Sequence, residues 1–273
     1  MAPQQGAGAG ELEAAQVRSM FDGIAWVYDA LNSAMTAGLH HRWRERAVDI
    51  SRVGPGDRVL DVATGTGDLA LELARRLGPA GEVVGSDFSE GMLARARAKA
   101  GRVDGASDVR GLAAMRFEWG DALALTYPDD SFDAATVGFG ARNFSDLSRG
   151  LAEMARVVRP GGRVVVLEFT TPTRPPLSFF YRFWFDRVVP LLGAAVAAAA
   201  SVRSRVGPAR ATDEREVGIA AAYSYLPNSV KRWPGPEILA AEMGRAGIAD
   251  VRCLLTAGGI VAIHAGTVST DSP

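Results

Sequence analysis

A short glycine-rich segment is the part of this sequence best suited to binding a ligand. It reads "DVATGTGDLA", spans residues 61–70 and follows the apolar letters "RVL". Gly65 and Gly67 permit backbone angles and a close ligand approach that a side chain would block. Such a loop between a strand and a helix can hold the pyrophosphate of a dinucleotide or the amino-acid end of S-adenosylmethionine. The loop alone does not choose between these two ligands.

The dinucleotide alternative has support, because "GTGDLA" fits G-x-G-x-x-A and Asp87 follows at about the required 20 residues. Three features weigh against it. Asp61 ends the first strand, where a carboxylate suits a ligand with an ammonium group better than a pyrophosphate. Asp121 in "WGDA" ends the third strand and can pair with an adenine amine. The segment "RPGGRVVVLEF" (159–169) places a Pro-Gly-Gly turn before the fifth strand.

The surrounding sequence alternates valine-rich strands with amphipathic helices, which predicts an α/β fold with a mostly parallel sheet covered on both faces. The expected strands are 58–63, 82–88, 115–121, 132–140 and 163–170, and the expected helices are 68–77, 90–100 and 147–158. A helix over 234–248 resumes the pattern. The stretches 249–257 and 259–266 then predict a closing hairpin with a tight turn at 258–259, which makes the last strand antiparallel.

The domain organisation follows from shifts in composition. Residues 17–50 have helical spacing and aromatic side chains, which predicts a helical cap before the sheet. We expect a single domain over 17–266, interrupted by an insertion or lid at about 171–236, with flexible tails at 1–16 and 267–273. Within the insertion, the polar segment 203–216 is typical of exposed chain.

Composition limits the classes of function. The chain has 273 residues, 48% of them hydrophobic, and a net charge of -1, so nothing indicates nucleic acid as a partner. The single cysteine, Cys253, excludes an internal disulfide and is expected in the core. The three histidines and this cysteine lack metal-ligand spacing, so no metal is expected. The apolar stretch 188–202 is shorter than the about 20 residues of a spanning helix, so no transmembrane segment is expected. The single cysteine fits a reducing cytosol, and the protein is expected to be cytoplasmic, with peripheral contact at the inner face of the membrane as an option.

The glycine loop, the acids after the second and third strands and the Pro-Gly-Gly turn together resemble class I S-adenosylmethionine-dependent methyltransferases, with a Rossmann-like fold. More specific stretches resemble the C-methyltransferases of ubiquinone and menaquinone biosynthesis. These stretches are "MFDGIAWVYDALNSAMTAGLHHRWRERAVD" (20–49), "VGFGARNFSD" (137–146), "EFTTP" (168–172) and "LTAGGIVAIHAG" (255–266). The resemblance covers about residues 17–200 and 223–266.

The resemblance implies S-adenosylmethionine as the methyl donor. It places cofactor contacts at Thr66, at Asp87 with the ribose hydroxyls, and at Asp121 and Ala122 with the adenine. Together with Asp61, Gly65 and Gly67 these residues form the expected cofactor site. Many members carry a serine just before "FG", where this chain has Gly138, so that contact is not carried over.

The family reaction methylates a ring carbon of a prenylated hydroquinone, and demethylmenaquinol is the expected substrate. A ring carbon is a weak nucleophile until the neighbouring hydroxyl loses its proton, so the enzyme must stabilise a phenolate. Arg142 can hold the oxyanion, Asn143 can orient a hydroxyl or water, and Tyr28 can relay a proton or contact the ring. Each has a structural alternative, which is loop tying or capping for Arg142 and Asn143 and core packing for Tyr28.

Several alternatives stay open. His40 and His41 are candidates for a base or exposed residues of the cap, whereas His264 is expected to be structural. The aromatic segment 175–192 suits an apolar channel, peripheral membrane contact or a buried lid helix. A homo-oligomer is compatible with the sequence. Other functions that remain are methylation of another lipophilic phenol or a ubiquinone-pathway benzoquinol, a dehydrogenase, and a non-catalytic quinone-binding scaffold.

Overall fold

The computed structural model describes residues 14–26, 28–104, 111–172 and 228–270, together with residues 175, 178, 179, 183, 187, 188, 191 and 225. Most of the predicted insertion at about 171–236, including 203–216, lies outside these residues. So do residues 1–13 and 271–273 of the predicted tails. Helix α1 begins at Ala14 and the last strand ends at Val268, so regular structure extends slightly into both predicted tails.

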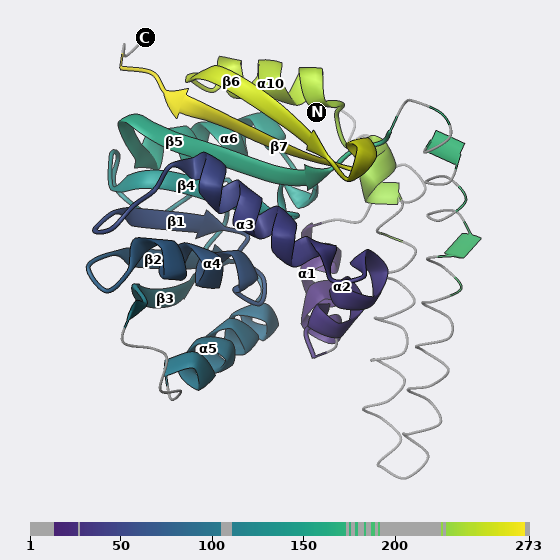
Figure 1. Ribbon diagram of the computed structural model, residues 1–273, viewed down its shortest axis with the longest axis horizontal. Coiled ribbons are helices and arrows are strands. Elements are labelled where there is room, and N and C mark those ends of the chain that lie inside the picture. The colour runs from purple at the N-terminus through teal and green to yellow at the C-terminus, as the bar shows by residue number, and fades with distance from the viewer. Residues whose placement is uncertain are drawn as a thin grey trace, which may run out of the picture.

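Seven strands of the described chain form one sheet, in the order β3-β2-β1-β4-β5-β7-β6 (Figure 1). The first five pair in parallel, and β7 runs antiparallel to both β5 and β6. The strands are β1 (Arg58–Val62), β2 (Glu82–Asp87), β3 (Ala114–Trp119), β4 (Phe132–Gly138), β5 (Val158–Phe169), β6 (Ile248–Thr256) and β7 (Val261–Val268). The predicted α/β class, with its mostly parallel sheet and antiparallel last strand, is confirmed.

Helices cover both faces of this sheet, which explains why the central strands are rich in buried apolar residues. On one face lie α3 (Leu39–Ser51) and α4 (Asp68–Leu77), which share buried side chains with β1, β2, β5 and β7. On the other face lie α6 (Leu147–Val157) and α10 (Pro236–Arg245). Helix α5 (Glu90–Asp104) packs against β3 and β2.

The predicted cap is made by α1 (Ala14–Ile24), α2 (Tyr28–Thr36) and α3. Helices α1 and α2 lie beside the carboxyl ends of the parallel strands (Figure 1). Asp22 of α1 accepts hydrogen bonds from Ser89 Oγ at 2.5 Å and from the backbone N–H of Gly91 at 3.0 Å. A carboxylate is favourable at the start of a helix, where N–H groups lack partners, so Asp22 fastens the cap to the start of α5.

The closing hairpin differs from the prediction in its turn and in one side chain. A short 3-10 helix, Ala257–Gly259, joins β6 to β7 in place of a two-residue turn, and Gly258 and Gly259 have φ angles of 68° and 92°. Cys253 is exposed, so its predicted place in the core is wrong. The reason is that β6 is the border strand, where most side chains after Ile248 are not covered by another element.

Two glycines allow a test of how closely the sheet packs behind the ligand loop. A Cβ at Gly85 of β2 would lie 2.6 Å from Phe117 Cδ1 and 3.0 Å from Thr64 Oγ1, whereas a Cβ at Gly101 of α5 would meet nothing within 4 Å. We expect Gly85→Ala to lower the free energy of unfolding by about 1–3 kcal/mol through overpacking. Gly101→Ala should raise it by about 0.5–1 kcal/mol through helix propensity. Urea denaturation of both variants measures the difference, and equal values would contradict this packing.

Candidate functional site

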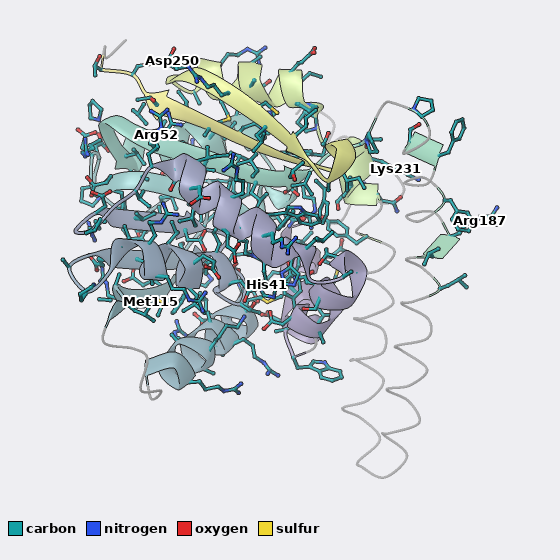
Figure 2. All side chains as sticks on the ribbon, viewed as in Figure 1. His41, Arg52, Met115, Arg187, Lys231 and Asp250 are labelled. Atoms are coloured by element: carbon teal, nitrogen blue, oxygen red, sulfur yellow. The ribbon has the colours of Figure 1, made fainter. Side chains whose placement is uncertain are left out.

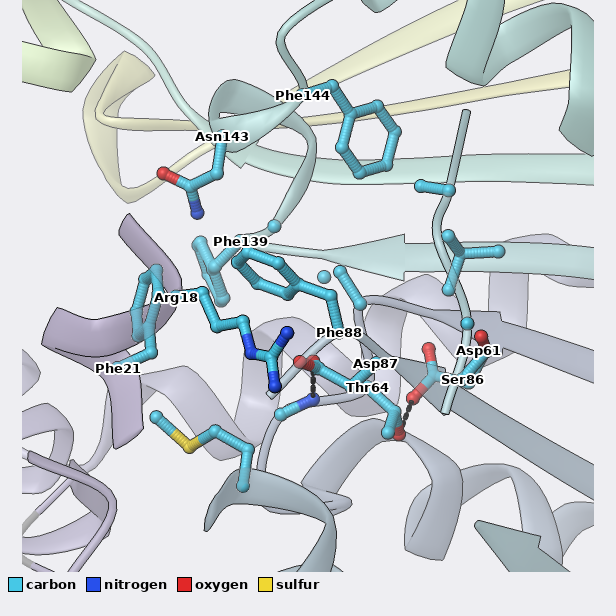
Figure 3. Close-up of a pocket in the computed structure, with 18 of the residues that line it drawn as sticks. Arg18, Phe21, Asp61, Thr64, Ser86, Asp87, Phe88, Phe139, Asn143 and Phe144 are labelled. Atoms are coloured by element: carbon cyan, nitrogen blue, oxygen red, sulfur yellow. Dashed lines mark hydrogen bonds between the residues drawn. The ribbon is translucent and has the colours of Figure 1, made fainter. Parts of the chain in front are cut away.

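A cavity of about 360 Å³ lies between the carboxyl ends of the parallel strands and the cap (Figure 3). Its wall contains six of the seven predicted cofactor residues, namely Asp61, Gly65, Thr66, Asp87, Asp121 and Ala122, and it also contains Tyr28 and Asn143. The seventh, Gly67, is not on the wall. Gly67 has a φ of 82°, and a Cβ there would lie 3.1 Å from both Ala96 and Phe117, so it shapes the loop from behind.

Asp61 is buried at the end of β1 and holds the glycine loop. Its side chain accepts hydrogen bonds from Thr64 Oγ1 at 2.6 Å and from Thr136 Oγ1 of β4 at 2.8 Å. Burial raises its pKa to about 6, although these hydrogen bonds and the charge of Arg44 lower it. Each oxygen of Asp61 accepts one of these two bonds, which fix the carboxylate and its negative charge at the cavity wall.

Asp87, at the end of β2, also holds the glycine loop. It accepts hydrogen bonds from the backbone N–H of Gly65 at 2.8 Å and of Ser89 at 2.9 Å (Figure 3). Burial raises its pKa to about 6, against the effect of these bonds. Each carboxylate oxygen has a second lone pair, so Asp87 can still accept hydrogen bonds from a pair of neighbouring hydroxyls.

The far end of the cavity is formed by the segment after β3. Asp121 is exposed, and its Oδ1 accepts a hydrogen bond from the backbone N–H of Leu123 at 2.9 Å. Trp119 is half exposed, and its Nε1 donates to the carbonyl of Phe88 at 3.1 Å. Aromatic and backbone groups thus lie beside the carboxylate, which is an arrangement suited to a flat heterocycle with an amine.

An ion network fastens the cap to the glycine loop. Thr66 Oγ1 donates a hydrogen bond to Asp29 of α2 at 2.5 Å. Lys99 of α5 pairs with Asp29 at 2.8 Å and also pairs with Asp68, the first residue of α4. Asp68 lies 3.4 Å from the guanidinium of Arg44 on α3. The network thus joins four helices, and Arg44 and Asp68 bring it to the cavity wall.

The two neighbouring histidines of the cap have different environments. His41 is exposed (Figure 2), as one of the sequence alternatives expected. His40 is only 2% exposed, so the same alternative is wrong for His40. The Nδ1 of His40 accepts a hydrogen bond from Arg44, and its Nε2 lies 3.1 Å from Ser33 Oγ. Burial, with the nearby charge of Arg44, lowers the pKa of His40 to about 4, which makes it a poor general base.

A smaller cavity of about 60 Å³ adjoins the first. Tyr28, Phe21, Phe139 and Arg44 line both cavities. The remaining wall of the smaller cavity is mainly apolar, and it is formed by Met20, Ile24, Met35, Phe169, Asn32, Thr36, His40, Arg142 and Tyr225. The larger cavity contains the strand-end carboxylates, and the smaller one is the more apolar of the two and contains a buried arginine.

Arg142 belongs to a buried ion pair. Its Nη1 donates to Glu168 Oε1 at 2.6 Å and to the carbonyl of Phe139 at 2.5 Å. Glu168 is fully buried, and burial raises its pKa while Arg142 lowers it. The buried Nε of Arg142 has no hydrogen-bond partner among the described residues. The expected loop-tying role is therefore present, and donor capacity remains for a ligand.

Asn143 was singled out from the sequence, whereas three other polar residues at or beside the two cavities were not. Asn143 Oδ1 accepts a hydrogen bond from Tyr225 at 3.0 Å. Sequence reasoning assigned no role to Tyr225, Glu168 or Arg44. Glu168 could have been found, because it lies at the carboxyl end of a predicted strand. Arg44 follows His40 by four residues, so helical spacing places both side chains on one face of α3, and the structure shows that this face is buried.

Two further expectations concern residues beside the site. His264 on β7 is buried, and its Nε2 bonds to the carbonyl of Pro236 at 2.9 Å, so its structural role is confirmed. A Cβ at Gly138 would lie 3.0 Å from Leu69, so a serine there would require Leu69 to move.

In the described part of the chain, no cluster of three or more potential metal-ligating side chains occurs. No described helix is long and apolar enough to cross a membrane.

Comparisons with known proteins agree with this geometry. A demethylmenaquinone methyltransferase of Thermus thermophilus is 45% identical over 247 residues, covering 90% of this chain and 99% of the relative. The ubiquinone/menaquinone biosynthesis C-methyltransferase UbiE of Geobacter sulfurreducens is 41% identical, covering 92% and 88%. The crystal structure of a SAM-dependent methyltransferase from Aquifex aeolicus matches with a TM-score of 0.54 at 17% identity, covering 82% of this chain and 89% of that one.

The similarity to the solved structure supports the class I S-adenosylmethionine-dependent methyltransferase fold. The family model described as ubiE/COQ5 methyltransferase matches residues 9–209 and 217–268, which is most of the sequence. The residues that it matches include the glycine loop, the strand-end acids and Arg142. The chain belongs to the ubiE/COQ5 methyltransferase family.

Proposed function

We propose that this enzyme transfers a methyl group from S-adenosylmethionine to a ring carbon of demethylmenaquinol and so makes menaquinol. The observation that carries the proposal is the junction of the two cavities. The larger one has buried carboxylates at strand ends, and the smaller one is mainly apolar and contains Arg142. A charged methyl donor and a lipophilic ring therefore have separate compartments that share Tyr28 and Phe139.

The larger cavity fits S-adenosylmethionine, which supplies the methyl group when bound. Asp87 accepts hydrogen bonds from the ribose hydroxyls through the lone pairs that Gly65 and Ser89 leave free. Asp121 and Ala122 bracket the adenine. Gly65 and Thr66 face the methionine portion, Asp61 places negative charge behind it, and Gly67 allows the loop to close against Phe117.

In the smaller cavity the protein must favour the phenolate form of the ring. The guanidinium of Arg142 stays charged, and its field is strong because its side chain is only 6% exposed. Glu168 fixes its position without removing its remaining donors. Asn143 orients the hydroxyl or a water molecule, and Tyr28 contacts the ring where the cavities meet. Water exclusion by the apolar wall strengthens each of these interactions.

A ubiquinone-pathway benzoquinol is the second candidate substrate, because the Geobacter sulfurreducens relative is named for both quinones. For either substrate, we propose that the protein also contacts the membrane surface peripherally. It is supported by Phe179 and Phe183, which are 66% and 60% exposed and could enter the interface beside a prenyl tail.

The substrate class can be tested by transfer of labelled methyl. We expect label from S-adenosylmethionine to enter chemically reduced demethylmenaquinone, because only the hydroquinone can form a phenolate. The oxidised quinone should remain unlabelled. A demethylated benzoquinol in a parallel reaction distinguishes the second substrate. Cofactor binding without labelling of any quinol would point to another lipophilic phenol as the substrate. Failure to bind S-adenosylmethionine would favour the quinone-binding scaffold, and binding of a nicotinamide cofactor instead would favour a dehydrogenase.

Arg142 needs a test that separates catalysis from folding. Arg142→Ala should reduce the free energy of unfolding by about 3–5 kcal/mol, because it leaves Glu168 buried without its partner. Arg142→Gln/Glu168→Gln removes both charges together. We expect this double variant to keep cofactor binding and lose about 100- to 1,000-fold in kcat.

Glu168→Gln is the matched control, since it retains the arginine charge and should keep most of the turnover. Arg245→Ala removes an exposed arginine and controls for net charge. Wild-type kcat in the Arg142→Gln/Glu168→Gln variant would remove Arg142 from the mechanism.

The raised pKa values of Asp61 and Asp87, each about 6, predict opposite pH dependences for binding and stability. Affinity for S-adenosylhomocysteine should rise between about pH 5 and pH 7, since a protonated carboxyl is a weaker acceptor, with each group contributing up to about 10-fold. The free energy of unfolding should instead fall between about pH 4 and pH 6, because the folded state binds more protons there.

Isothermal titration calorimetry and urea denaturation across this range measure the two dependences. Asp87→Asn should lower the affinity at neutral pH by about 10-fold or more and reduce its pH dependence. Asp250→Asn, at an exposed position of β6, should match the wild type. Affinity that is constant across this pH range would contradict a role for these carboxylates.

A further inference from the structure

A buried arginine of the cap lies where the two cavities meet. Arg44 of α3 is 6% exposed and lines both of them. On the wall of the larger cavity its neighbours include Asp61, Asp68 and the glycine loop, which form the proposed methionine end. The proposed binding and catalytic roles do not include Arg44. A guanidinium is charged at any accessible pH, so its burial requires compensating groups.

The protein supplies acceptors for only some of the hydrogen-bond donors of the Arg44 guanidinium. Its Nη1 donates to Nδ1 of His40 and, at 3.3 Å, to the carbonyl of the same residue. Its Nη2 lies 3.4 Å from Asp68, which is longer than the about 2.7–2.9 Å of a charge-assisted hydrogen bond. Asp68 has a closer cation in Lys99. No acceptor in the described chain takes a hydrogen bond from the Nε of Arg44. The guanidinium is fixed in direction and still has donors to offer.

The partner that holds Arg44 is a neutral histidine. A guanidinium has no acceptor atom, so the Nδ1 of His40 must accept, and the proton of the ring lies on Nε2 beside Ser33. This contact with a neutral ring fixes the Arg44 guanidinium without adding a negative charge beside it. His40 is therefore a positioning residue for a cation on the cavity wall.

The other arginine of the larger cavity lies at a different place. Arg18 of α1 has a half-exposed side chain, and its guanidinium points into the cavity near Phe88 and Asp87 (Figure 3). That is the proposed ribose end. Arg44 is thus the arginine on the cavity wall at the methionine end, where the negative charge of Asp61 is also present.

We propose that Arg44 binds the α-carboxylate of the methionine portion of S-adenosylmethionine, with Asp61 supplying the opposite charge on the side of the α-ammonium group. This inference rests on the proposed cofactor site. A free amino-acid terminus carries both charges, so a site with a fixed cation and a fixed anion recognises it and discriminates against adenosyl thioethers that lack the carboxylate. Because Arg44 also lines the smaller cavity, the same contact places the donor end of the cofactor beside the ring substrate.

The test compares two ligands and three variants by isothermal titration calorimetry. The ligands are S-adenosylmethionine and decarboxylated S-adenosylmethionine, which lacks only the carboxylate. Wild-type protein should bind S-adenosylmethionine about 10- to 100-fold more tightly, as expected for a charge-assisted hydrogen-bonded pair. Arg44→Gln should lose that preference and bind decarboxylated S-adenosylmethionine within about 3-fold of wild type. Arg44→Lys should keep part of the preference, because it keeps the charge but not the planar donors.

Arg46→Gln is the matched control, since Arg46 lies on the same helix with a side chain that is 58% exposed. It should keep the full preference. An equal loss of affinity for both ligands in Arg44→Gln would show a merely structural role and overturn the proposal. A wild-type protein without any preference would overturn it even if Arg44→Gln does not fold. If wild-type protein binds neither ligand, the cofactor site itself fails, and that result is distinct from both.

Discussion

The structure of the site depends on two buried carboxylates at adjacent strand ends. Burying a charge without partners is costly, so Asp61 and Asp87 must recruit donors from the chain around them. Asp61 takes the hydroxyls of Thr64 and Thr136, and Asp87 takes the backbone N–H groups of Gly65 and Ser89. These bonds fix the glycine loop in the conformation that leaves a cavity above it. The charges that the ligand is proposed to meet therefore also build the site.

A network of polar contacts also holds the cap against the glycine loop. Thr66, Asp29, Lys99, Asp68 and Arg44 form a chain of polar contacts that joins α2, α3, α4 and α5. Isolated surface pairs contribute little to stability, but these groups are partly or fully shielded and act as a network. Cap position and loop geometry are thereby linked, and a ligand that contacts Arg44 and the loop would bridge the two.

Fold similarity alone would not identify the reaction, because this fold serves many reactions. The more specific information lies in the second cavity, where an apolar wall surrounds Arg142 and its partner Glu168. Removing one partner of such a buried pair is strongly destabilising, whereas replacing both charges together is often neutral. The proposed phenolate site uses a cation that the protein holds in place before the substrate arrives.

The sequence by itself determined the layers of the fold, the loop and the strand-end acids, because these follow from local patterns. Helix α4 begins and ends at the predicted residues 68 and 77, and Asp61, Asp87 and Asp121 lie where the strand-end rule expects them. Tertiary structure decided the hydrogen-bond partners of the site residues. Arg142 bonds to Glu168, Asn143 to Tyr225, and Arg44 to His40. Tertiary structure also decided that Cys253 lies outside the core. The physical reason is that periodicity fixes which face a residue takes, whereas its partner depends on how distant elements pack, and a border strand leaves apolar residues uncovered.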